Sequence, residues 1–187
     1  MAKSSNNVIT HGLSGTVGGM LVFRQQGNKT IVAKRPSKRT TALKESEMQV
    51  QERFKAAASY AKVAIKDPVL KELYQAAAKP GQTAYNVAFA DYFSAPVVKE
   101  ISSSLYTGAV DSKIQIQVIE DFKVASVKVE IFGADQTLLE SGDAVSAGND
   151  LDWSYKATLE NADLEGTKIT VSAKDLAGNI TVKSLIL

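Results

Sequence analysis

Ile114-Gln115-Ile116-Gln117-Val118 is the stretch that decides the fold, because apolar and polar residues alternate strictly along it. A period of two places every second side chain on the same face of a β-strand. The same alternation recurs over residues 127–131, 151–157 and 169–173, and residues 180–187 close the chain. Glycines with aspartate or asparagine separate these runs, as turns require. Short alternating strands at this spacing predict an antiparallel β-sandwich.

The residues before this stretch follow the helical period of 3.6 instead. Asp67 suits the N-cap of a helix that begins at Pro68, and Thr83 suits the N-cap of a short third helix that Pro96 ends. A first helix is expected between about residues 43 and 65. The apolar residues expected on its buried face are Met48, Phe54, Ala57, Ala58, Ala61 and Ile65.

The first forty residues predict a β-hairpin. Two β-favouring runs, residues 20–24 and 29–34, flank a Gly27-Asn28 turn. A glycine-rich arm precedes the hairpin, and an extended connector around Pro36 follows it. The sequence therefore predicts an α+β chain with a glycine-rich basic arm and β-hairpin at 1–42, a helical segment at 43–96, and an all-β sandwich at 97–187.

The charges of these segments differ although the whole chain carries only +2. Residues 1–44 hold eight lysines and arginines and no carboxylate, which gives +8. Residues 45–100 are neutral, and residues 101–187 hold seven basic and thirteen acidic residues, which gives −6. Opposite charge at the two ends favours contact between copies of the chain.

Six N-terminal cations form the candidate interaction surface: Arg24, Lys29, Lys34, Arg35, Lys38 and Arg39. The favoured partner is another copy of the chain, or another acidic assembly protein. Nucleic acid is a less favoured partner, held through its phosphates. Phe23 is the only aromatic residue in this block, so a base-stacking platform is missing. The third interpretation is a merely solvated basic face.

The residue inventory argues against most catalytic chemistry. The chain has no cysteine and one histidine, His11, which leaves no thiolate nucleophile and little for a serine triad or a zinc site. We expect no enzyme activity, no cofactor and no metal. Three other sites are less favoured: a phosphate loop at 11–19, an acid/base pair among Glu100, Glu120 and Asp121, and a calcium site among Asp111, Glu120, Asp121, Asp143, Asp150, Asp152 and Asp175. Each lacks the spacing or the defined geometry that its chemistry needs.

The third segment resembles the immunoglobulin-like modules that recur in bacterial surface and phage proteins. The residues that carry this resemblance are Val127-Lys128-Val129-Glu130-Ile131, Gly142-Asp143-Ala144, Trp153-Ser154-Tyr155 and Ala173-Lys174-Asp175-Leu176-Ala177-Gly178-Asn179-Ile180-Thr181. The first hundred residues loosely resemble uncharacterised proteins of Bacteroidota genomes, some of them near prophage-like loci. The order of Gly18-Gly19, Val22-Phe23-Arg24, the Pro36 segment and a Gln/Arg/Phe helix carries that likeness. The first resemblance implies an immunoglobulin-like sandwich and leaves the function open, because such domains serve adhesion, spacing and assembly alike. The second implies a structural or particle-associated protein.

The expected function is that of a non-enzymatic, self-associating component of a phage, a phage-tail-like particle or a surface filament. A carbohydrate- or protein-binding module, or a nucleic-acid-associated protein, is the alternative. The start of the sequence lacks the apolar stretch of a secretory signal, and no run is long enough to span a membrane. We therefore expect cytoplasmic synthesis, with later incorporation into a virion or an extracellular particle as one destination.

Overall fold

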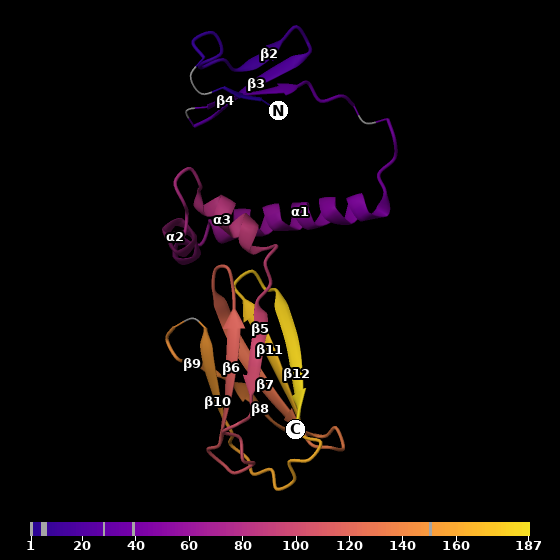
Figure 1. Ribbon diagram of the computed structural model, residues 1–187, viewed down its shortest axis with the longest axis vertical. Coiled ribbons are helices and arrows are strands. Elements are labelled where there is room, and N and C mark those ends of the chain that lie inside the picture. The colour runs from indigo at the N-terminus through magenta and orange to yellow at the C-terminus, as the bar shows by residue number, and fades with distance from the viewer. Residues whose placement is uncertain (1, 5–6, 28, 39, 150) are drawn as a thin grey trace. The chain divides into compact units, whose positions relative to one another are not determined.

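The computed structural model describes residues 2–4, 7–27, 29–38, 40–149 and 151–187 (Figure 1). Over these residues the chain is an α+β protein with three helices and twelve strands in three antiparallel sheets, so the predicted fold class is confirmed. The chain divides into two compact units, Met1–Glu52 and Arg53–Leu187. The segment boundaries expected after residues 42 and 96 stay a prediction. None of the described helices is both long and apolar enough to cross a membrane.

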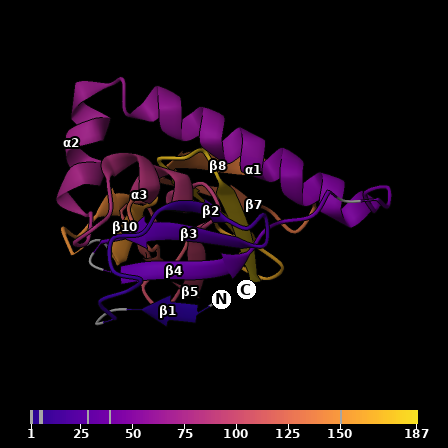
Figure 2. The same ribbon diagram turned by 90° about the horizontal axis from the view of Figure 1, so that it is seen from above.

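The first unit contains a small sheet in the order β1-β4-β3-β2 (Figure 2). Its strands are β1 Ala2–Ser4, β2 Gly15–Val17, β3 Leu21–Gln26 and β4 Lys29–Lys34. The predicted hairpin of β3 and β4 is confirmed, and Gly27 has the positive φ of 57° that such a tight turn needs. The two short outer strands were not predicted.

Three helices follow: α1 Glu45–Ala64, α2 Pro68–Ala76 and α3 Ala84–Asp91. Both predicted N-caps are confirmed. The Asp67 side chain accepts a hydrogen bond from the Val69 backbone N–H at 2.8 Å, and the Thr83 side chain accepts one from the Asn86 N–H. These contacts satisfy helix N–H groups that have no partner within the helix.

The buried face of α1 is narrower than the periodicity predicts. Ala57, Ala61 and Ala64 are buried, whereas Met48 and Phe54 remain 44% and 58% exposed. Small alanine side chains allow close helix packing, and Ala61 and Ala64 join Tyr74 of α2 in one apolar cluster with Ala84 and Ala88 of α3. The expectation that Met48 and Phe54 lie on the buried face was therefore wrong.

The remaining strands form a sandwich of two four-stranded sheets, ordered β5-β6-β10-β9 and β12-β11-β7-β8. The β5–β12 strands are Val97–Ser102, Lys113–Ile119, Val124–Phe132, Leu138–Asp143, Val145–Ser146, Asp152–Lys156, Lys168–Asp175 and Ile180–Ile186. Lettered along the chain as A, B, C, C′, D, E, F and G, the sheets are ABED and GFCC′.

The alternating residues of the sequence fill the core between these sheets. In β6, Ile114, Ile116 and Val118 are fully or almost fully buried, while the glutamines between them are exposed. The inward residues of β7 and β11 complete the core from the other sheet. Each large side chain that is buried in this way stabilises the fold by about 1.5–3 kcal/mol.

The sequence around Asp175 and Asn179 joins the sandwich to the helical segment. The Asp175 carboxylate accepts hydrogen bonds from the backbone N–H and the side-chain amide of Asn179, both at 2.7 Å. Gly178 provides the positive φ of 93° in this turn. The Asn179 amide also donates to the backbone carbonyls of Tyr92 and Ser94, which follow α3. This stretch therefore closes the last hairpin and holds the chain that links α3 to β5.

Candidate interaction surface

The N-terminal sheet gathers three cations on one of its faces. Residues that lie opposite each other on neighbouring strands point to the same side of a sheet. Lys3 of β1 pairs with Ile31 of β4, and Ile31 pairs with Arg24 of β3, so these three form one row. Lys29 lies on the same face, two positions from Ile31. The exposed side chains of Lys3, Arg24 and Lys29 therefore give this face a positive charge.

The other predicted cations lie elsewhere on the unit. Lys34 pairs with Leu21, which places it on the opposite face of the sheet. Arg35 follows β4, and its backbone N–H donates to the Met20 carbonyl at 2.7 Å. Lys38 lies on the exposed connector, and Arg39 lies outside the described residues. The six predicted cations therefore do not form one face, and Lys3 joins Arg24 and Lys29 instead.

This unit buries very little of its apolar surface. Among its described residues, only Phe23 and Thr30 are buried. Large apolar side chains are exposed instead: Val8 is 94% exposed, Ile9 is 83% and Met20 is 70%. Small sheets need a packing partner for stability in water, and clustered exposed apolar residues mark interaction sites.

Phe23 occupies the inner position of this sheet. It pairs with Gly15 on one side and Val32 on the other, and it is only 9% exposed. Its ring is therefore not free to stack on a base. A nucleic acid on this surface would be held by lysine and arginine contacts to phosphate.

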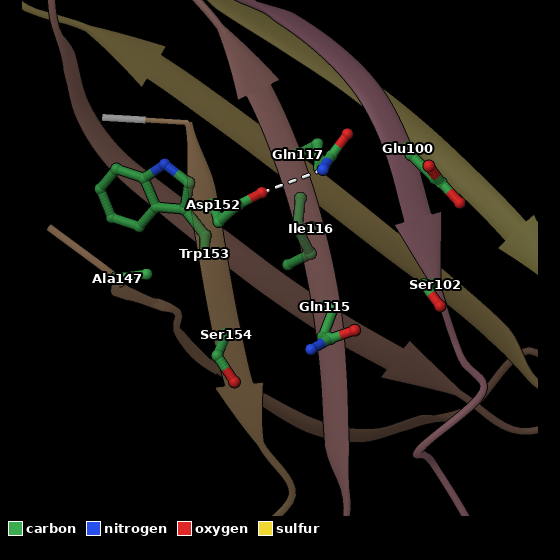
Figure 3. Close-up of a pocket in the computed structure, with 9 residues that line it drawn as sticks. All are labelled: Glu100, Ser102, Gln115, Ile116, Gln117, Ala147, Asp152, Trp153 and Ser154. Carbon is green, nitrogen blue, oxygen red and sulfur yellow. Dashed lines mark hydrogen bonds between the residues drawn. The ribbon is translucent and has the colours of Figure 1, made fainter. Parts of the chain in front are cut away.

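A second candidate surface lies on the outer face of the sheet formed by β5, β6 and β10. It is a hollow of about 470 Å³ (Figure 3). The Gln117 Nε2 atom donates to Asp152 Oδ1 at 3.0 Å across its rim. The polar side chains around it come from three neighbouring strands: Glu100, Ser102, Gln115, Gln117, Asp152 and Ser154. Carboxylates, amides and hydroxyls in this arrangement suit a polar ligand rich in hydroxyl groups.

The two aromatic residues of β10 belong to the core side of the same sheet, as the alternation predicts. Tyr155 is 4% exposed, and its hydroxyl donates to Glu140 Oε2 at 3.2 Å. Burial and the Glu140 charge raise the pKa of Tyr155 to about 12. Trp153 is partly buried and packs against the core, although it also borders the hollow.

A chain of hydroxyl groups connects the helices to a buried carboxylate. The Tyr60 and Tyr74 hydroxyls lie 2.7 Å apart, and the Tyr74 hydroxyl donates to Asp91 Oδ2 at 2.7 Å. The Tyr60 hydroxyl also lies 3.2 Å from the Leu176 carbonyl oxygen, to which it donates. Asp91 is only 4% exposed, and its Oδ1 atom has no hydrogen-bond partner among the described residues. Desolvation raises the pKa of Asp91 to about 6.

Further carboxylates surround Asp91. Asp121 and Asp175 both raise the pKa of Asp91, and burial raises the pKa of Glu120 beside them. Glu100 lies instead on the rim of the hollow, so the three residues weighed as an acid/base pair do not form one group. Within the described residues, no cluster of three or more histidine, aspartate or glutamate side chains is arranged to hold a metal ion. Asp150, part of the calcium alternative, lies outside those residues.

Known proteins offer little likeness to this chain. No family model matches it, and no curated protein matches it. Among solved structures, a crystal structure of an engineered protein matches at 19% identity with a TM-score of 0.33. The match covers 63% of this chain and 26% of the engineered protein, so it spans about a quarter of that protein's length.

Proposed function

We propose that this chain is a non-enzymatic assembly protein that associates with copies of itself through its N-terminal unit. The setting that the sequence resemblances support is a phage, a phage-tail-like particle or a surface filament. In such an assembly the sandwich serves as the body of each subunit. The N-terminal sheet supplies the contact to the next one.

One observation carries this proposal: the N-terminal unit exposes its apolar residues and buries only two described side chains, Phe23 and Thr30. Burial of apolar surface is the main stabilising contribution to a folded domain. Val8, Ile9 and Met20 would gain this contribution only when another surface covers them. The excess of cations in this unit favours an acidic cover, and a second copy offers one because residues 101–187 carry −6.

Self-association of the full chain tests the proposal. Light scattering over a range of protein concentrations should show a mass that rises above that of the 20.0 kDa monomer. Replacing Val8, Ile9 and Met20 by serine should abolish the rise, because these side chains contribute apolar surface to the contact. Serine at Val63 and Val69, which are 63% and 67% exposed on the helical segment, is the matched control and should leave association unchanged. A wild-type chain that stays monomeric at every concentration would refute self-assembly.

The hollow on β5, β6 and β10 supports a second candidate, a module that binds carbohydrate. Its amide and carboxylate groups match the hydroxyl groups of a sugar. A glycan array with the full chain would give a signal that Gln117→Ala and Asp152→Ala remove. The absence of any signal would leave this second candidate without support.

A further inference from the structure

Loops form the end of the sandwich away from the helices (Figure 1). Three loops meet there: residues 103–112 between β5 and β6, residues 133–137 between β7 and β8, and residues 157–167 between β10 and β11. They contain no lysine, arginine or histidine. Their carboxylates are Asp111, Asp135, Glu160, Asp163 and Glu165. Asp111 forms an ion pair with Lys156 at the end of β10, at 2.8 Å. We call these three loops the distal loops.

The distal loops also expose large apolar side chains. Leu105 is 50% exposed, Val110 is 53% and Leu159 is 54%. The three residues come from the two longer loops, which the hydrogen bonds between those loops bring together. Acidic and apolar side chains therefore share this end, just as basic and apolar side chains share the N-terminal sheet.

Hydrogen bonds hold the distal loops in a fixed conformation. The Asn161 N–H donates to the Gly108 carbonyl at 2.7 Å, and the Asp111 N–H donates to the Ala157 carbonyl at 2.9 Å. Below them, Glu140 Oε2 accepts hydrogen bonds from the Thr158 N–H at 2.8 Å and from the Thr158 hydroxyl at 2.7 Å. A rigid surface loses little conformational entropy when it binds.

We infer that the distal loops of one copy receive the N-terminal sheet of the next copy, in a head-to-tail contact. This inference rests on the proposed self-assembly and names the surface that the N-terminal sheet meets. The N-terminal sheet and the distal loops complement each other both in charge and in exposed apolar side chains. The Arg24 and Lys29 face meets loops that carry five carboxylates, and the exposed Val8 and Ile9 meet Leu105 and its apolar neighbours.

A head-to-tail contact uses a different surface on each partner, so it propagates from copy to copy. It therefore forms rings if the rotation closes and filaments if it does not. Charge pairs at such a contact set its direction and its partner, because like charges repel the wrong orientation. This geometry suits a subunit of an extended particle.

Charge reversal in the full chain tests the inference. One variant carries Arg24→Glu and Lys29→Glu, and a second carries Glu160→Lys and Glu165→Lys. Asp163 is left in place, because its Oδ1 atom accepts the Glu165 N–H. The first variant places two glutamates opposite the acidic loops, and the second removes two of the five loop carboxylates and adds two lysines. Each should therefore weaken self-association about tenfold or more in light scattering. An equal mixture of the two variants restores opposite charges between copies, so association should return.

Matched controls move the same number of charges elsewhere on the exposed surface. Lys55→Glu with Lys71→Glu, and Glu72→Lys with Asp143→Lys, should leave association within about twofold of wild type. Circular dichroism and the fluorescence of Trp153 establish that each variant is folded.

The outcomes separate this inference from the proposed function. If wild type associates and only the Arg24 and Lys29 variant weakens it, the N-terminal sheet binds another surface, and the inference is wrong while self-assembly stands. If both variants weaken association and their equal mixture does not restore it, the two charged surfaces do not meet between copies, and the inference is also wrong. If wild type never associates, the proposed function fails and the inference fails with it.

Discussion

Replacing Asp91 by asparagine should stabilise the protein at neutral pH. Asp91 is 4% exposed, and its Oδ1 atom has no hydrogen-bond partner among the described residues. Tyr74 donates to its other oxygen, and the acidic Asp121 and Asp175 lie close enough to oppose its charge. An amide at this position keeps the oxygen that Tyr74 needs and removes the buried negative charge.

The size of the effect follows from the pKa of Asp91, which burial raises from 3.8 to about 6. The folded protein therefore binds this proton more tightly than the unfolded chain does. The ionised carboxylate destabilises the fold by the full penalty above about pH 6. This penalty shrinks as the pH falls from about 6 and disappears below the ordinary pKa of 3.8. A rise of about two pKa units corresponds to a penalty of about 3 kcal/mol at about pH 7.5, which falls to about 1 kcal/mol at about pH 4.5.

Urea unfolding followed by the fluorescence of Trp153, the single tryptophan, measures this effect. The free energy of unfolding of Asp91→Asn should exceed that of wild type at about pH 7.5, and the difference should shrink by about 2 kcal/mol at about pH 4.5. Asp67→Asn, at an exposed helix cap, is the matched control and should show no comparable pH-dependent gain. An Asp91→Asn variant that is less stable than wild type at about pH 7.5, or a difference that does not change with pH, would refute the reasoning.

Three further substitutions test individual contacts by the same urea measurement. Gly108→Ala should lower the free energy of unfolding by about 2–4 kcal/mol, because its Cβ would lie 2.2 Å from the Asn161 carbonyl oxygen at a φ of +80°. Gly178→Ala, which has a positive φ but open space around it, should lower it by about 1 kcal/mol. Equal costs for the two glycines would contradict the close approach. Glu140→Ala should cost about 3 kcal/mol or more, because it leaves four buried or half-buried donors without their acceptor. A cost below about 1 kcal/mol would mean that water replaces the carboxylate. Asp67→Ala should cost about 1 kcal/mol through the lost N-cap, and an unchanged stability would show that the cap is dispensable.

Local signals in the sequence predicted the elements that local chemistry controls. The alternation of residues 114–118 indicated β6, and Asp67 with Pro68 marked the start of α2. The Gly27 turn indicated the hairpin, because the φ of a turn residue depends on that residue and its immediate neighbours. These features depend on neighbours in the chain, and so they could be read from the sequence.

Features that depend on distant residues could not be predicted. The pairing of β1 and β2 with the hairpin has no pattern of its own, because three-residue strands carry too little periodicity. The burial of Asp91 was missed because a carboxylate on a helix ordinarily faces water. The acidic distal loops appear only when the topology brings Asp111 beside residues 157–167. The sequence showed an excess of negative charge in this half of the chain, and the fold places five of its carboxylates at one end.

Phe54 shows that helical periodicity alone does not predict burial. The helical spacing placed it on the buried face of α1, but that face consists of alanines from Ala57 onward. The Phe54 ring instead packs edge-on against Phe89 of α3, with ring centroids 4.8 Å apart, and stays 58% exposed. A single apolar residue at helical spacing thus indicates a face of the helix and does not settle whether that face is covered.

Sedimentation velocity of the full wild-type chain tests self-assembly most directly. The proposed head-to-tail contact predicts sedimentation that becomes faster as protein concentration rises at low salt. Added salt should reverse this increase, because the contact between cations and carboxylates is screened. A single 20.0 kDa species at every concentration, at low salt as well as at high salt, would contradict the proposal.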